Sequence, residues 1–407
     1  MSNVVASSNF DVGRVRGLYP ALGSGPAPLD GPFGAIQPES VIRAVIATLR
    51  GSPAQPGAHS SRSRSSATVV RHARQALADL VGSEPSGVYF GGTLAALNAQ
   101  FADIVSWGWR LGDEVALSRL DASSVSDPWQ RAARMVGAGV RWSEVDLETG
   151  ELPIWQYDQL INPNTRLVSV PLANPALGFV PDIRSISEVA HENGALVYVD
   201  AGAAVPHLTI DLPSLGADIV GLNTASFGGP TVAALITRPG LLAEINATSI
   251  RPPRSAEVGP LPIELLAGAT AAVDHLAGLD QRAVGTRRQR LTASITAARR
   301  HTSALLDYLE QGLQHQPHVT VLGSLTDRVP VLAFTVARHT PDQVAEALER
   351  NGVSVWTGPT DVEALLESFG ADEHGGATFV GLMPHTTAAE IDLLLDGLFT
   401  LRAAPRR

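Results

Sequence analysis

Two short stretches carry groups that could do chemistry, and each follows an apolar run typical of a buried strand. Asp200 closes one run and offers a carboxylate at the strand end, although such a residue could also merely cap a neighbouring turn. Gly91-Gly92-Thr93 opens a helical pattern, so its backbone N–H groups and the Thr93 hydroxyl could bind a phosphate. An ordinary helix start capped by Thr93 explains the same residues equally well.

A third stretch, Thr224-Ala225-Ser226-Phe227-Gly228, has a faint likeness to the G-x-S-x-G nucleophile turn of serine hydrolases. The first glycine of that motif is replaced by Thr224, and the residues that follow predict a turn and then a strand. A nucleophile turn of this kind must lead into a helix instead. The pattern therefore argues against a serine hydrolase.

The composition excludes several kinds of chemistry. All 30 basic residues are arginine, and the sequence of 407 residues contains neither lysine nor cysteine. Without a thiol there can be no thiolate nucleophile, disulfide or cysteine metal site. Without a lysine amine, no side chain can form a Schiff base with a carbonyl compound or with pyridoxal phosphate (PLP).

The charge and hydropathy of the chain argue against some classes of partner. A net charge of −10 argues against a general nucleic-acid binder, and we expect none. We find no signal-peptide pattern and no run of about 18 apolar residues, so we expect a cytoplasmic protein without a membrane partner. His207, His374 and His385 are scattered and lack paired spacing, so we expect no metal site.

Helical and strand patterns alternate between about residues 69 and 279. Short apolar runs, typical of strands buried on both faces of a sheet, occur at Val88–Phe90, Val115–Leu117, Leu167–Val170, Ala195–Val199 and Ile219–Leu222. Helical patterns occur at Val69–Val81, Thr93–Trp107, Pro128–Val136, Ile183–Glu192 and Glu264–Leu279. This alternation predicts an α/β fold with a mainly parallel sheet.

The remainder of the chain predicts a smaller α+β domain. After a long arginine-bearing helical stretch at Arg282–Leu313, strand and helix patterns continue to Leu401. We expect residues 35–285 to form a large domain and residues 1–34 with 286–407 to form the small one. The arginines of the long helix predict a solvated face, and Ser60–Ser66 (SSRSRSS) predicts a mobile loop rather than a phosphate or nucleic-acid contact.

Several landmarks in order along the chain give it a resemblance to a known family. It resembles the class V aminotransferases, in particular the cysteine desulfurase-like branch of the fold-type I PLP-dependent transferases, and looks like a lysine-less actinobacterial-type member. The landmarks are Gly92-Thr93-Leu94-Ala95-Ala96-Leu97-Asn98, Arg119-Leu120-Asp121, Pro128-Trp129, Val197-Tyr198-Val199-Asp200, Gly228-Gly229-Pro230-Thr231 and Glu257-Val258-Gly259-Pro260-Leu261.

This resemblance implies an aspartate aminotransferase-like fold with a three-layer α/β/α large domain, a small α+β domain and a homodimer. It also implies a PLP site at the carboxyl ends of the strands. There Gly92 and Thr93 would bind the phosphate, and Asp200 would pair with the pyridinium nitrogen. The lysine that holds PLP in the family falls at Ser226, so we expect covalent PLP to be absent.

Other positions also depart from the family. The ring-stacking histidine falls at Ala122 or Ser123, and the carboxylate-binding arginine falls at Phe379. Gly202 or Ala203 stands where a side chain would bond the ring hydroxyl, and Pro175, one place after Asn174, stands where the family has an asparagine. Pro260 takes the place of a phosphate-contacting threonine.

Two functions remain open. One is a non-catalytic member, a pseudoenzyme with a ligand-binding, scaffolding or regulatory role, and with vestigial cofactor-binding residues Gly92, Thr93, Asp200 and Ser226. The other is an enzyme that acts on non-covalently bound PLP, its amine form PMP, or another small phosphorylated ligand in the same place. A label of aminotransferase would then describe the fold rather than the mechanism.

Overall fold

A computed structural model describes residues 10–23, 25–146, 151–248, 255–323, 328–358 and 363–402. Residues 1–9, which we assign by sequence to the small domain, lie outside them. Among the described residues, none of the helices is both long and apolar enough to cross a bilayer.

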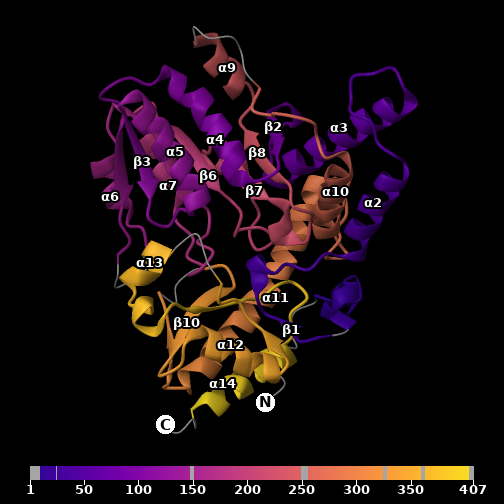
Figure 1. Cartoon of the computed structure of the whole chain (residues 1–407), viewed down its shortest axis with the longest axis vertical. Helices are drawn as coiled ribbons and strands as arrows, with labels where there is room; N and C mark the ends of the chain where they lie inside the picture. Colours follow the sequence, from indigo (N-terminus) through magenta and orange to yellow (C-terminus); the bar gives the residue numbers. More distant parts are fainter. Residues whose placement is uncertain are drawn as a thin grey trace.

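A seven-stranded sheet forms the centre of the larger part of the molecule (Figure 1). Its strand order is β2-β8-β7-β6-β5-β3-β4. The five strands β7, β6, β5, β3 and β4 run parallel, whereas β8 is antiparallel to both of its neighbours. The strands are β2 (Val88–Gly91), β3 (Glu114–Ser118), β4 (Gly139–Ser143), β5 (Thr165–Pro171), β6 (Leu196–Asp200), β7 (Ile219–Asn223) and β8 (Ala233–Thr237).

Helices cover both faces of this sheet and make three layers. On one face, α4 (Leu94–Val105) and α5 (Ser123–Val136) pack on a core that includes Trp129 and Tyr198. The opposite face is covered by α3 (Ser61–Val81), α7 (Ile183–Glu192) and α10 (Ile263–Ala277). The alternation of side chains along each buried strand divides them between these two cores.

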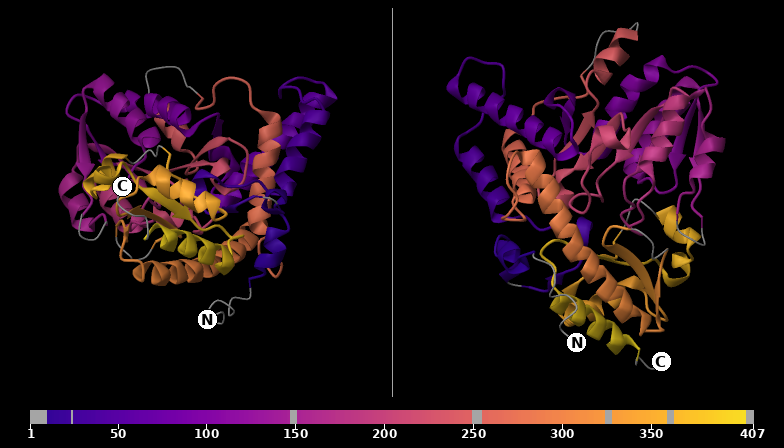
Figure 2. Two further views of the ribbon diagram at one scale, coloured as in Figure 1. Left: turned by 60° about the horizontal axis from the view of Figure 1, so that its bottom comes forward. Right: turned by 180° about the vertical axis from the view of Figure 1, so that it is seen from behind.

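The smaller part of the molecule is built on a three-stranded antiparallel sheet in the order β12-β10-β9 (Figures 1 and 2). The long helix α11 (Arg287–Gln314) leads into it from the large part. Strand β1 (Ala27–Pro28) pairs with β11 (Val353–Ser354), so the N-terminal segment joins this part. The remaining elements here are β9 (Val319–Val321), β10 (Val331–Val336), α12 (Pro341–Arg350), α13 (Glu363–Ser368), β12 (Thr378–Gly381) and α14 (Ala388–Leu401).

Shorter helices complete the described chain. These are α1 (Val12–Arg16), α2 (Glu39–Arg50), α6 (Ile154–Leu160), α8 (Leu212–Leu215) and α9 (Leu241–Thr248). Helix α10 packs against both α2 and α3 at one flank of the large part (Figures 1 and 2).

The α/β fold with a mainly parallel sheet is confirmed, and the helix predicted over Ile183–Glu192 has those bounds in α7. One prediction was wrong: Ser60–Ser66 is not a loop. Ser60 caps α3 by accepting a hydrogen bond from the Ser63 backbone N–H, and the next six residues form the first turns of the helix. A serine at the cap position offsets the weak helix propensity of the serines that follow.

Candidate functional site at the carboxyl edge of the large sheet

The sheet topology brings the predicted site residues to one edge. Strands β6 and β7 are parallel neighbours, and β2 runs in the same direction because β8 is antiparallel to both β2 and β7. In register, Gly91 and Asn223 both pair with Ala233, so they lie in one row across the sheet. The stretches that follow β2, β6 and β7 therefore leave the sheet at the same edge, where open α/β sheets bind ligands.

Asp200 is the last residue of β6 and is half-buried. Its Oδ1 accepts a hydrogen bond of 2.9 Å from the Gly202 backbone N–H, so the carboxylate caps the turn that follows the strand. Its register neighbour on β7 is Gly221, where a Cβ would lie 2.1 Å from the Tyr198 hydroxyl and 3.2 Å from a Leu94 methyl. The absence of a side chain at Gly221 thus leaves room on β7 for the Tyr198 hydroxyl and for Leu94 at the start of α4.

Gly92 and Thr93 are exposed at the start of α4. The Thr93 hydroxyl oxygen accepts a hydrogen bond of 3.2 Å from the Ala96 backbone N–H, which is an ordinary N-cap. The hydroxyl hydrogen stays able to donate, so capping and a ligand contact are compatible. A phosphate role for Gly92 and Thr93 stays a prediction.

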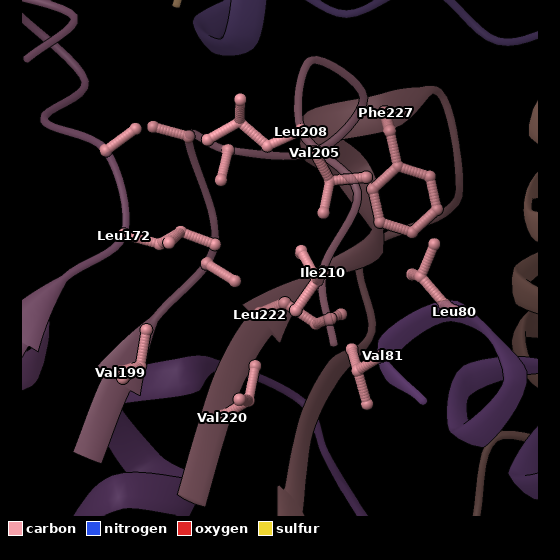
Figure 3. Packing of buried hydrophobic residues seen from close by; sticks show 14 of the residues in the cluster. Leu80, Val81, Leu172, Val199, Val205, Leu208, Ile210, Val220, Leu222 and Phe227 are labelled. Atoms are coloured by element: carbon pink, nitrogen blue, oxygen red, sulfur yellow. The ribbon is translucent and has the colours of Figure 1, made fainter. Parts of the chain in front are cut away.

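Ser226 lies in a short 3₁₀ turn, η5 (Thr224–Phe227), directly after β7. Its hydroxyl donates to the Asn223 backbone carbonyl at 2.9 Å, and the Asn223 side chain in turn accepts from the Ala225 N–H at 3.0 Å. The next residue, Phe227, is buried and points toward Leu80 of α3 in the core beneath the turn (Figure 3). These hydrogen bonds fix the conformation of the turn, and the Ser226 hydroxyl is bonded to the backbone.

A second carboxyl group, Asp121, joins the site from the loop between β3 and α5. Its side chain is buried, and Oδ2 accepts a hydrogen bond of 3.1 Å from the Ser118 N–H. Oδ1 is buried as well and has no hydrogen-bond partner. Burial, with a further contribution from the charge of Asp200, raises the pKa of Asp121 to about 7. Asp121 therefore exchanges a proton near neutral pH.

Buried hydroxyl groups lie on the same side of the sheet as Asp200. Ser169 of β5 and Tyr198 of β6 are register partners; the Ser169 hydroxyl lies near the Asp121 carboxylate and the Tyr198 hydroxyl near the Asn98 side chain, neither in full hydrogen-bond geometry. The Tyr198 ring packs edge-on against Trp129 with ring centroids 5.7 Å apart. Burial raises the pKa of the Tyr198 hydroxyl, so it is a neutral donor. Together with Asp121 these groups form a polar layer beneath the sheet edge.

Sequence reasoning missed this polar layer for identifiable reasons. In the sequence, Asp121 stands out only as part of the family landmark Arg119-Leu120-Asp121. An aspartate at or shortly after a strand end is, however, the same signal that marks Asp200. Ser169 and Tyr198 fall inside apolar runs, and the period of two along each strand is what places them on one face. A search for carboxylates at or just after the ends of strands that lie close in the sheet, here β3 and β6 on either side of β5, finds the Asp121–Asp200 pair.

The positions that depart from the family have structural roles. Ala122 is the residue before the first turn of α5 and offers no ring. The Asn174 side chain is buried, accepts from the N–H groups of Ala176 and Leu177, and donates to the Leu120 carbonyl. Phe379 is buried beside Phe33, with ring centroids 5.8 Å apart.

A hollow of about 450 Å³ lies nearby, between α4 and α5. Its lining includes Ala95, Ala99, Ser123 and Asp127, but not Thr93, Asp200 or Ser226. Across the described parts of the chain, His, Asp and Glu side chains do not gather in threes as a metal site requires.

Comparison with known proteins agrees with this geometry. The family model described as Aminotransferase class-V matches residues 29–394, and the chain belongs to this family. An uncharacterized protein of Mycobacterium tuberculosis is 40% identical over 398 residues, which cover 96% of this chain and 99% of that relative.

More distant relatives include proteins described as cysteine desulfurases. A probable cysteine desulfurase of Mycobacterium leprae is 28% identical over 323 residues, which cover 76% of this chain and 50% of that protein. This chain thus spans about half the length of that relative. The apo structure of a cysteine desulfurase from Thermococcus onnurineus NA1 superposes with a TM-score of 0.84 at 19% identity, covering 97% of this chain and 99% of that chain. The fold is therefore that of the fold-type I PLP-dependent transferases.

The family uses PLP, and the side chains of this site can be tested against that cofactor. Ser226 stands in the turn after β7, where the resemblance implies lysine, and its hydroxyl is bonded to the Asn223 carbonyl. Ala122 cannot stack on a ring, and the Asp200 Oδ1 already caps a turn. These residues do not fit a coenzyme held through a lysine side chain.

Proposed function

We propose that this family member binds a small ligand without a covalent link and acts as a pseudoenzyme in binding or regulation. The observation that carries the proposal is the Ser226 turn. A serine whose hydroxyl is engaged by the Asn223 carbonyl cannot replace an amine, either as the covalent anchor or as the base that moves a proton. The chain contains no lysine at any other position that could take over either task.

A second candidate is an enzyme that acts on non-covalently bound PLP, PMP or another phosphorylated ligand at the same edge. The Asp121–Asp200 pair favours it, because a carboxyl group with a pKa of about 7 can donate or accept a proton near neutral pH. The exposed Gly92 and Thr93 at the start of α4 would then face the phosphate.

The first test is covalent trapping. Wild-type protein is incubated with PLP, reduced with borohydride and digested, and the peptides are mapped by mass spectrometry. We expect no PLP adduct on any internal peptide. Mapping is essential because PLP can also react with the α-amine at the N-terminus. An adduct within the chain, or B6-dependent conversion of an amino acid by this chain alone, would overturn the proposal.

The second test separates binding from its absence. Thermal unfolding is followed with PLP, PMP and inorganic phosphate, since a ligand that binds only the folded state raises the melting temperature. Stabilisation by PLP or PMP that is lost in Asp200→Ala, but kept in the exposed control Asp158→Ala, would locate the ligand at this edge. Turnover of such a ligand would favour the second candidate, and binding without turnover the first.

We also propose a homodimer in the cytoplasm, on the strength of the family membership. Sedimentation velocity of the full chain tests the assembly, and a species with the mass of one chain, 42.7 kDa, at micromolar concentration would contradict it.

A further inference from the structure

A cavity of about 260 Å³ lies between the end of α2 and the first two turns of α3. Thr48 and Gly51 line it from α2, and Ile263 lines it from α10, at the flank where α10 packs against both α2 and α3 (Figure 2). The side formed by α3 carries the polar residues Ser61, Arg62, Ser65 and Ser66 together with the apolar Val69. The cavity is separate from the sheet edge described above, because neither Thr93 nor Asp200 lines it.

Ser66 is the unusual member of this lining. Its side chain is 2% exposed, and its hydroxyl oxygen is buried without any hydrogen-bond partner. Ser63, buried one turn earlier, accepts from the Ala58 N–H at 2.9 Å and donates to the Gln55 carbonyl at 2.8 Å. A buried hydroxyl left without a partner costs stability. A ligand in the cavity would remove that cost.

The charges around the cavity select for an anion. Arg62 lines it, and no aspartate or glutamate does. The 21 residues of α3 begin at Ser61, so the positive end of the helix dipole lies at this end. The Arg62 guanidinium makes one long hydrogen bond of 3.3 Å to the Ser52 carbonyl, and its remaining N–H groups can face a ligand. This local positive charge stands out in a chain of net charge −10.

We propose that this cavity binds a phosphate group, either as inorganic phosphate or as a small phosphomonoester. Arg62 pairs with its charge, and Ser61, Ser65 and Ser66 donate hydroxyl hydrogen bonds to its oxygens. A tetrahedral oxyanion has enough acceptors for these donors. The apolar side chain of Ile263 on the opposite wall can contact the organic part of a monoester.

Isothermal titration of the full chain with inorganic phosphate, and separately with β-glycerol phosphate, tests the site. We expect Arg62→Gln and Ser66→Ala to weaken binding at least about tenfold, since each removes a contact to a charged group. Arg64→Gln is the matched control. It removes the same charge from the same exposed helix start, but Arg64 donates to the His59 carbonyl and does not line the cavity. We expect at most about a twofold effect, because solvent and salt screen a charge that does not contact the ligand.

Two further variants make the result decisive. Ser65→Ala changes an exposed residue of the lining and leaves the helix intact, so it tests the site even if Ser66→Ala unfolds. Thr93→Ala reports on phosphate bound at the sheet edge and should not change this affinity. Equal losses in Arg62→Gln and Arg64→Gln, a loss caused by Thr93→Ala alone, or no binding of either probe would each overturn the proposal. The tighter of the two probes identifies the source of the phosphate.

Discussion

Asp121 and Asp200 follow strands on either side of β5 at the carboxyl edge of the large sheet, and the charge of Asp200 adds to burial in raising the pKa of Asp121 to about 7. The chain therefore has two interacting carboxyl groups at the place where the family binds its coenzyme. An acid that is neutral at low pH and charged above neutrality couples this edge to pH, and this coupling can be measured.

We expect Asp121→Asn to raise stability at pH 8 by an amount on the order of a few kcal/mol. The folded state holds a proton on Asp121 up to about pH 7, whereas the unfolded chain loses it near the ordinary pKa of an aspartate, 3.8. Stability therefore falls as pH rises between those two values, and asparagine removes the loss. Urea unfolding of both proteins from pH 4 to pH 8 measures it.

The same pair gives a spectroscopic check. Asp200→Asn removes the neighbouring charge and should lower the pKa of Asp121, although burial keeps it above the value in an unfolded chain. Carbon NMR of labelled aspartate follows this titration directly. An unchanged midpoint would mean that the two carboxyl groups do not interact.

A lysine placed at position 226 tests whether the carboxyl edge of the large sheet can still bind the coenzyme of the family. We expect Ser226→Lys to form a borohydride-reducible PLP adduct on residue 226, because the turn is anchored in the core by Phe227 and places the new amine after β7. Ser226→Ala is the control and should form none. We expect amino-acid turnover to stay undetectable, since Ala122 and Phe379 still replace the ring-stacking and carboxylate-binding residues. Efficient turnover would show that those replacements matter little.

Glu257 joins three elements near this edge. Its carboxylate pairs with Arg74 of α3 at 2.7 Å and accepts the Phe90 N–H of β2 at 2.9 Å, just before the glycines that open α4. We expect Glu257→Ala to destabilise the fold by about 2–4 kcal/mol, because the Phe90 N–H loses its acceptor and the partly buried Arg74 guanidinium, which keeps its bond to the Val88 carbonyl, loses its counter-charge. Glu257→Gln keeps an acceptor and should cost less. Equal midpoints of urea unfolding for wild type and Glu257→Ala would contradict this role.

The layers of the fold follow from short-range patterns, and this is why the sequence predicts them. Apolar runs between helical periods define β5, β6 and β7, and a cap residue followed by a helical period defines α7. The start of α3 could not be found in this way, because the weak helix propensity of its serines hides a helix that depends on the Ser60 cap and on packing against α10. The Asp121–Asp200 pair depends on β3 and β6 lying on either side of β5, and only the sheet order supplies that.

Buried histidines give the chain an acid sensitivity of opposite sign to that of Asp121. His385 is buried against Tyr19, with ring centroids 4.9 Å apart, and burial with the charge of Arg16 lowers its pKa to about 3. The unfolded chain binds a proton on this ring near pH 6.5, so stability falls as pH drops from there toward 3. The loss from this residue alone is about 2 kcal/mol at about pH 5.

We expect His385→Phe, which keeps the ring contact and cannot titrate, to flatten the decline of melting temperature between about pH 7 and pH 4. The ring Nδ1 has no hydrogen-bond partner, so the variant loses little at that atom. His72→Phe, at an exposed position on α3, is the matched control and should keep the wild-type slope. If His385→Phe and wild type lose stability in parallel on acidification, the acid sensitivity arises elsewhere. The next residues to test are then His207 and His275, two other buried histidines whose pKa values burial lowers.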